Sequence, residues 1–144
     1  MKRKIPSLFF ALFLWYSYAQ QISNGWTVLD PNKADKIIYV SDSDGTNNGV
    51  VYSFPSPVIG SDPMTPSGTI AAFKTIDQAM ENVDDGEAAW VLFKRGDVFQ
   101  GGIPPQSGAV QDRPFLYSSY GTAQELPLFL TGAESAVSFC CTGL

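Results

Sequence analysis

The sequence predicts an all-β protein, with two architectures open from the residues alone: a solenoid of stacked repeats and a small antiparallel sandwich. After Gly86 the chain consists of short apolar runs that end in Gly, Pro or polar clusters, which is typical of strands and turns. Only residues 69–83 show helical spacing. An apolar run around Val91 recurs at Phe115, a separation that suits one turn of a stacked repeat. Frequent turns between short strands are equally typical of a sandwich.

The first nineteen residues have the pattern of a secretory signal peptide. Residues 2–4 are basic, and the apolar run "IPSLFFALFLWYSYA" follows them. Ser17 and Ala19 are small residues at the −3 and −1 positions of a signal-peptidase site, which predicts cleavage before Gln20. The run is shorter than the roughly 20 apolar residues of a membrane-spanning helix. We therefore expect export by the Sec route to the periplasm, the cell surface or the medium, with no membrane attachment after cleavage.

The mature chain, residues 20–144, is expected to be acidic. It holds six Lys and Arg against fourteen Asp and Glu, a net charge of −8. Nucleic acid and anionic membranes are poor partners for such a chain because like charges repel. Calcium and neutral polymers remain as expected partners.

The residue types also limit the chemistry. The chain contains no His, which excludes Ser-His-Asp and Cys-His catalysis and His-ligated zinc. The two cysteines, Cys140 and Cys141, are adjacent, so a disulfide between them is strained and a metal site lacks further ligands. Any reaction would depend on Asp, Glu, Lys, Arg or Tyr.

The first half of the mature chain alternates strands with long loops. A polar segment, residues 20–35, precedes "KIIYVS" (36–41), whose β-branched and aromatic residues predict a strand. "DSDGTNNG" (42–49) is a loop by composition, and "VVYSF" (50–54) is a brief strand. Residues 55–68 contain four prolines and are expected to form an exposed excursion.

One short amphipathic helix is predicted next. Thr75 followed by Gln78 fits a capping box, which places the helix start near Thr75. Asp77 in the first turn suits the helix dipole, and Asp84 to Gly86 is a natural stop. The residues at helical spacing are Phe73, Ile76, Ala79, Met80 and Val83. Beyond the helix, strands are predicted within residues 88–94, 97–103, 114–121 and 126–132.

Five pieces of the chain, taken in order, carry a resemblance to a protein family. They are "KIIYVS" with "DGTNNG", "FKTIDQAM", "WVLFKRGDVFQGG", "SGAVQDRPFLYSSYG" and "LPLFLTG", running from about Ile37 to Gly132. In this order they resemble the N-terminal part of secreted, pectate-lyase-like proteins with a right-handed parallel β-helix. The resemblance implies that residues 36–144 are an N-terminal capping helix plus the first one or two coils of an incomplete β-helix.

The β-helix interpretation predicts which side chains face inward and where the chain turns. The helix would cover the apolar end and open strand edges of the first coil. The side chains expected inside the coil are Trp90, Leu92, Phe99 and Ile103. The glycines expected at tight corners are Gly96, Gly101, Gly102 and Gly121.

The resemblance also implies a function. Enzymes of this type cleave polysaccharide as lyases or glycoside hydrolases, and their active sites lie on later coils. There, carboxylates bind calcium or act as acid and base. Since such enzymes are several times longer, we expect this chain to be a truncated N-terminal portion without the active site, and no catalytic residue is assigned. The alternative is a non-catalytic protein for surface adhesion or carbohydrate binding.

The tripeptide Arg95-Gly96-Asp97 matches a known cell-adhesion ligand. An adhesive ligand needs its Arg and Asp displayed on a mobile, exposed loop, whereas this one follows and precedes apolar runs. We interpret it as a corner between two strands, in which Asp97 accepts hydrogen bonds from turn amides and Gly96 permits the bend.

A candidate calcium site lies in the loop at residues 42–49. Asp42, Asp44 and Asn47 offer clustered oxygen ligands, which Ca²⁺ prefers. Gly45 comes too early for an EF-hand, and no Glu stands at the required distance. The competing interpretation is an Asx-rich surface turn. No other cofactor is indicated.

Overall fold

The computed structural model describes residues 22–23, 26–27, 29–109 and 113–132. The expected signal peptide, its cleavage site and the two cysteines fall outside these residues. Two short strands, β1 (Ile22–Ser23) and β2 (Trp26–Thr27), pair antiparallel, and the 3-10 helix η1 (Pro31–Lys33) follows them.

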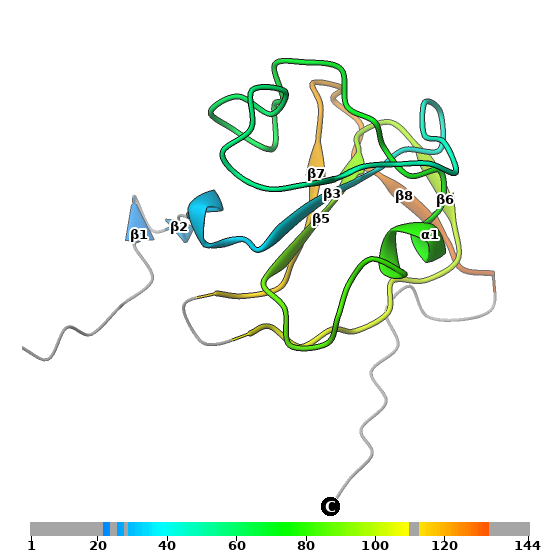
Figure 1. Ribbon diagram of the computed structural model, residues 1–144. Helices are drawn as coiled ribbons and strands as arrows, with labels where there is room; N and C mark the ends of the chain where they lie inside the picture. Colours follow the sequence, from blue (N-terminus) through cyan, green and yellow to red (C-terminus); the bar gives the residue numbers. More distant parts are fainter. Residues whose placement is uncertain (1–21, 24–25, 28, 110–112, 133–144) are drawn as a thin grey trace, which may run out of the picture.

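The main sheet contains three parallel strands. Its order is β4-β3-β5-β7, and β3 (Lys36–Val40), β5 (Ala89–Lys94) and β7 (Leu116–Tyr120) run in the same direction (Figure 1). The fourth strand, β4 (Val51–Tyr52), pairs antiparallel with β3. Each strand lies inside a run that the sequence predicted as a strand.

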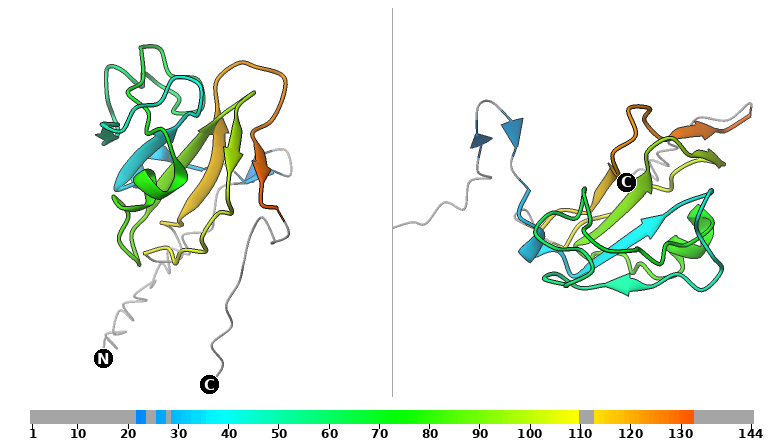
Figure 2. Two further views of the ribbon diagram at one scale, coloured as in Figure 1. Left: turned by 90° about the vertical axis from the view of Figure 1, so that its right-hand side faces the viewer. Right: turned by 90° about the horizontal axis from the view of Figure 1, so that it is seen from above.

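A second, smaller sheet also consists of parallel strands. β6 (Val98–Gln100) follows β5 after a short corner, β8 (Leu128–Leu130) follows β7, and β6 and β8 pair in parallel. Two strand–corner–strand units therefore stack on each other, as Figure 2 shows from two sides.

The register between the two units differs from the expected one. Val91 pairs with Tyr117 and not with Phe115, so the expected repeat spacing was too short. In the second sheet Val98 pairs with Leu128, which makes the separation between the units longer still at that point. The apolar run misled the prediction because strand register is set by pairing across the sheet rather than by the start of a run.

The core explains why the run before Lys94 is continuously apolar. Residues 89–93 are all buried, so both faces of β5 are covered. Val91 and Phe93 join Phe99 in one cluster, and Ile103 packs against it. Parallel strands that are covered on both faces lose the alternation of polar and apolar residues.

The side chains on the other face of β5 do not belong to the interior that the sequence predicted for them. Trp90 and Leu92 belong to a separate cluster with Tyr39, on the face opposite Phe99, so their assignment to the same interior was wrong. Successive side chains of a strand point to opposite faces, which separates Trp90 from Val91. Ile59, from the proline-rich excursion, is fully buried in this second cluster. The excursion at residues 55–68 is therefore partly a cover for the sheet.

The helix α1 (Ile76–Met80) begins where the capping box predicts. The Thr75 hydroxyl accepts from the Gln78 amide at 3.3 Å, and the Gln78 side chain accepts from the Thr75 amide at 3.3 Å. Ile76 and Ala79 are buried in the cluster that contains Phe99. The helix is shorter than its apolar pattern because Phe73 is extended and exchanges backbone hydrogen bonds with the end of β3.

Three of the four glycines expected at corners adopt a conformation that favours glycine. The φ angles of Gly96, Gly101 and Gly121 are 84°, 95° and 95°, whereas Gly102 is not among the glycines with positive φ. Gly96 and Gly121 lie in the corners that follow β5 and β7, respectively. Both stacked units therefore use a glycine of positive φ to turn after the first strand.

Candidate functional site

The carboxyl ends of the three parallel strands meet at one end of the main sheet. Val40 pairs with Phe93, and Lys94 pairs with Tyr120, which brings Ser41, at the end of β3, beside them. The loops from the proline-rich excursion fold over the same end (Figure 1). A backbone hydrogen bond of 2.9 Å from the Gly121 amide to the Met64 carbonyl joins the excursion to the corner after β7.

A cleft of about 560 Å³ lies between these loops and the strand ends. Its lining residues are Asp44, Thr65, Pro66, Gly68, Thr69, Ile70, Lys94, Tyr120, Gly121 and Thr122. A volume of this size is typical of ligand sites, which range over about 300–1,000 Å³. A second cleft, of about 360 Å³, is lined by Leu29, Pro31, Ser61, Asp62, Pro63, Met64 and Trp90.

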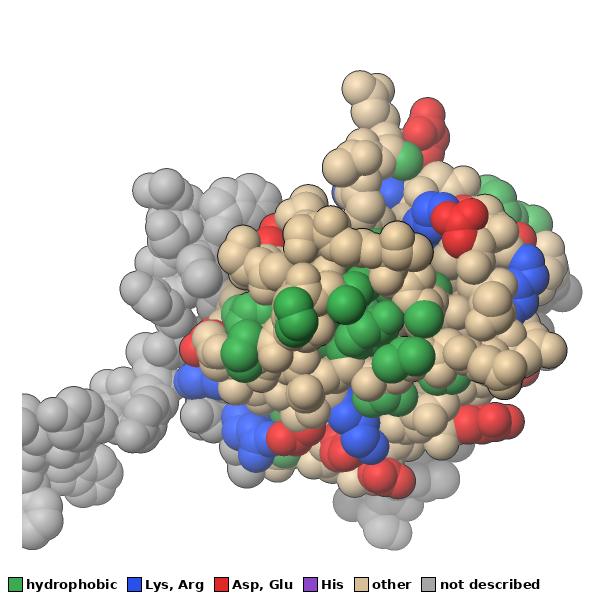
Figure 3. Space-filling model, turned by 45° about the horizontal axis from the view of Figure 1, so that its top comes forward, with side chains coloured by type: hydrophobic (Ala, Val, Ile, Leu, Met, Phe, Trp, Pro, Cys, Tyr) green, Lys and Arg blue, Asp and Glu red, His purple; other side chains and the backbone are tan. Residues whose placement is uncertain are grey.

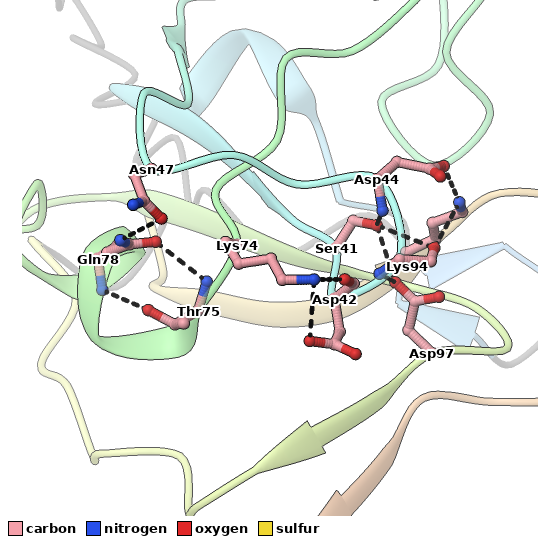
Figure 4. A network of polar contacts seen from close by, with 10 residues as sticks. Ser41, Asp42, Asp44, Asn47, Lys74, Thr75, Gln78, Lys94 and Asp97 are labelled. Atoms are coloured by element: carbon pink, nitrogen blue, oxygen red, sulfur yellow. Dashed lines mark hydrogen bonds and ion pairs between the residues drawn. The ribbon is translucent and has the colours of Figure 1, made fainter.

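The charged groups of the larger cleft are paired with each other. The Lys94 ammonium forms an ion pair with Asp44 and donates to the Ser43 hydroxyl at 2.9 Å (Figure 4). The Asp44 side chain is 70% exposed, against 29% for Lys94. The cleft therefore contains one positive and one negative charge, which cancel.

Tyr120 supplies a neutral phenol to the cleft. Burial raises the pKa of Tyr120 above its ordinary value, and the nearby Asp97 carboxylate raises it further. Its ring packs edge-on against Tyr39, with ring centres 4.8 Å apart. Tyr39 in turn donates to the Pro63 carbonyl at 2.9 Å. Tyr120 is therefore a protonated, firmly held part of the cleft wall.

A buried carboxylate holds the loop beside the cleft. Asp97 is only 8% exposed, and its Oδ2 accepts from the Ser41 hydroxyl at 2.8 Å and the Ser43 amide at 3.1 Å. Burial alone would raise the pKa of Asp97, but the hydrogen bonds from Ser43 and Ser41 and the charge of Lys94 outweigh it and lower that pKa. Asp97 is therefore ionised at neutral pH and fixes the loop that carries Asp44.

The other two residues of the tripeptide, Arg95 and Gly96, form hydrogen bonds with the segment that follows β7. Arg95 Nε donates to the Ala123 carbonyl at 2.6 Å, and a terminal guanidinium nitrogen donates to the Gln124 carbonyl at 3.0 Å. The Gly96 amide donates to the Glu125 carbonyl at 3.0 Å. The predicted role of Asp97 as an acceptor for a turn amide is confirmed. The tripeptide, which lies in the corner after β5, is therefore bonded to the chain after β3 and to the chain after β7. Its Arg and Asp are engaged within the protein.

The candidate calcium ligands have three different partners. Asp42 pairs with Lys74 at 3.4 Å, Asp44 pairs with Lys94, and Asn47 accepts from the Gln78 side chain at 3.0 Å (Figure 4). The structure does not gather them around a common point. Within the described ranges, no group of three or more His, Cys, Asp or Glu side chains is placed to hold a metal ion.

The surface at this end is mainly uncharged. Figure 3 brings the top of the molecule forward, and hydrophobic side chains gather in the middle of that face. The Lys, Arg, Asp and Glu side chains lie chiefly towards its margins. No helix among the residues that the structure describes is long and apolar enough to cross a membrane.

Sequence reasoning did not find the larger cleft. Its residues come from the loop after β3, the proline-rich excursion and the chain just after it, the last residue of β5, and the end of β7 with the corner that follows, which are distant in the chain. Of the lining residues, the sequence had singled out Asp44 as a calcium ligand and Gly121 as a corner glycine, and neither as part of a cleft. Comparison of the chain with protein-family models, curated proteins and solved structures finds no match in any of the three.

Proposed function

We propose that this chain forms the N-terminal cap and first coils of a right-handed parallel β-helix, in an exported protein that acts on polysaccharide as a lyase or glycoside hydrolase. The observation that carries the proposal is the parallel stacking of two strand–corner–strand units, β5–β6 and β7–β8. An antiparallel sandwich does not account for these pairs. Parallel crossovers within a sheet are right-handed in about 98% of cases, which supports the handedness.

In this proposal the first element of the stack is β3. It pairs in parallel with β5, while β4 and the helix α1 lie beside it. Such elements protect the first coil from further strand pairing, as the ends of repeat proteins require. The described part of the chain then starts the stack and presents the cleft, and the cleavage chemistry belongs to later coils. Fold alone does not define activity, so the substrate class rests on the resemblance of the sequence to polysaccharide-cleaving proteins.

The second candidate is a non-catalytic carbohydrate-binding protein with the same architecture. The observation that favours it is the larger cleft, in which Lys94 and Asp44 neutralise each other and threonine hydroxyls lie nearby. The Lys94 ammonium and the Asp44 carboxylate are engaged with each other, and the cleft offers hydroxyl groups as its remaining polar contacts. This candidate requires sugar binding without cleavage.

The experiment uses the exported protein, beginning at Gln20, and a panel of insoluble and soluble polysaccharides. Co-sedimentation measures binding, while new reducing ends report hydrolysis and unsaturated uronate ends report lyase activity. We expect retention on at least one polysaccharide without cleavage. Cleavage by this chain would refute the placement of the active site outside it. Absence of retention on the whole panel would contradict the polysaccharide role.

Gene sequencing distinguishes the enzyme hypothesis from the binding-protein hypothesis. Sequencing the source locus beyond codon 144 tests whether further coils follow the present units. Additional segments that repeat the strand spacing of the present units, and that carry grouped Asp, Arg and Lys, support the enzyme. Further repeats that lack grouped Asp, Arg and Lys support the non-catalytic candidate.

A further inference from the structure

We propose that the larger cleft is a binding site for an uncharged sugar unit, and that Lys94, Asp44 and the threonines of its rim contact the sugar hydroxyls. The inference rests on the proposed polysaccharide function and goes beyond it by naming the site and the charge class of the ligand. It concerns binding alone and involves no reaction step.

The charge pattern of the cleft selects a neutral ligand. The Lys94 ammonium has three N–H donors, and Asp44 and the Ser43 hydroxyl engage two of them. An anionic sugar must compete with Asp44 for Lys94, and a cationic one must compete with Lys94 for Asp44. A hydroxyl can accept from the third N–H, or donate to the exposed Asp44 carboxylate, while the ion pair stays intact. The acidic character of the whole mature chain further disfavours polyanions.

The rest of the wall has the mixed character that a sugar ring requires. Thr69 and Thr122 are exposed and add hydroxyls that both donate and accept. The Thr65 hydroxyl donates to Asp62 at 2.9 Å and is left to act as an acceptor. Pro66 and Ile70 provide apolar surface for the C–H faces of a ring. Specificity in ligand sites commonly comes from a few placed polar groups within an apolar lining.

The cleft is held in shape before any ligand arrives. Tyr120 is packed against Tyr39, and the Gly121 amide is bonded to the Met64 carbonyl, which connects the two walls. Asp97 holds the loop that carries Asp44. A preformed site loses little conformational entropy on binding, which favours the weak contacts of a sugar.

The test is an amide-shift titration of the isotope-labelled exported protein by NMR. The probes are neutral hexasaccharides of glucose, xylose and mannose, with an oligogalacturonate of the same length as the anionic comparison. We expect a neutral probe to shift the amides of Gly68, Thr69, Gly121 and Thr122, and the anionic probe to leave them unchanged.

Two cleft variants and one control sharpen the test. Thr122→Trp fills the cleft from its exposed rim and is expected to weaken neutral binding at least tenfold. Ser107→Trp is the matched control, because Ser107 is exposed and does not line the cleft. Its amide donates to Asp85, which precedes β5 in the chain. Asp44→Asn frees Lys94 and is expected to create binding of the anionic probe.

The outcomes separate this inference from the proposed function. Preference of the unmodified protein for the anionic probe, shifts confined to other surfaces, or undiminished binding by Thr122→Trp each overturn the cleft assignment. If Thr122→Trp also keeps its retention on polysaccharide, the proposed function stands without the cleft. If neutral probes shift the cleft amides but no polysaccharide retains the protein, the cleft stands and the polysaccharide role fails.

Discussion

Replacing Asp97 by Asn tests whether the buried corner carboxylate holds the stack together. The substitution keeps the size of the side chain and one oxygen acceptor, but it removes the negative charge. Asp97 accepts from the fully buried Ser41 hydroxyl and from the Ser43 amide, and Ser41 also accepts from the Asp44 amide at 3.0 Å. Loss of the charge therefore weakens one connected set of contacts between the ends of β3 and β5.

The expected cost follows from those two hydrogen bonds. A hydrogen bond to a charged group contributes about 1.5–3 kcal/mol, against roughly 1 kcal/mol for a neutral one. Converting two charged bonds into neutral ones gives a loss of about 1–4 kcal/mol in the free energy of unfolding at neutral pH. Asp97→Ala leaves the Ser41 hydroxyl and the Ser43 amide without this acceptor and is expected to cost more.

The assay is urea unfolding followed by tryptophan fluorescence, since Trp90 is only 3% exposed in the fold. The pKa of Asp97 lies below its unfolded value of 3.8, so its contribution is present above pH 3.8 and is lost as pH falls through the folded pKa. The difference between Asp97→Asn and the unmodified protein should therefore shrink between pH 7 and pH 3. Glu81→Gln, an exposed carboxylate, is the control and should change stability by less than about 0.5 kcal/mol. Equal unfolding midpoints for Asp97→Asn and the unmodified protein at pH 7 would refute the reasoning.

Three further predictions concern the stack, the helix and the metal. In a background with both natural cysteines replaced by serine, the double variant Val98→Cys and Leu128→Cys should form a disulfide, because residues paired across neighbouring strands lie about 4.8 Å apart. The double variant Val98→Cys and Leu130→Cys, in which the two positions lie about 8 Å apart, should not form one. Equal cross-linking of the two variants would contradict the register. Thr75→Ala should lower the free energy of unfolding by about 1 kcal/mol through loss of the cap, measured by urea unfolding, and an unchanged midpoint would contradict the capping role. Calcium should leave the Tm unchanged in calorimetry, because lysines neutralise the two acidic groups of the 42–47 loop, whereas a concentration-dependent rise would restore a calcium site.

Local features of the fold could be predicted because their signals lie within a few residues. The strand β3 follows from a β-branched run, and the start of α1 follows from the reciprocal bonds of Thr75 and Gln78. The corner glycines Gly96 and Gly121 follow from the positive φ that a tight turn requires. Each of these depends on contacts short in sequence, so tertiary packing did not have to be known.

The orientation of Trp90 and Leu92 could not be predicted in the same way. An alternating pattern shows which face of a strand is buried, but β5 is buried on both faces and therefore shows no alternation. One of the residues that cover the second face is Ile59, which belongs to a proline-rich stretch that composition alone identifies as exposed. The candidate site was missed because its walls come from three loop segments and the ends of two strands, which are distant in the chain.

The sequence by itself determined where the strands from β3 to β8 lie, where the helix α1 begins and where the chain turns, because backbone preference and short-range hydrogen bonds decide these; it did not show the short strands β1 and β2 in the polar segment 20–35. Only the tertiary structure decided that Asp97 is a buried hydrogen-bond acceptor and that Asp42 and Asp44 form ion pairs with different lysines. It also decided that Lys94 and Tyr120 pair across the sheet and line one cleft. These contacts join residues far apart in the chain, and strand register, which brings them together, depends on the packing of the whole core.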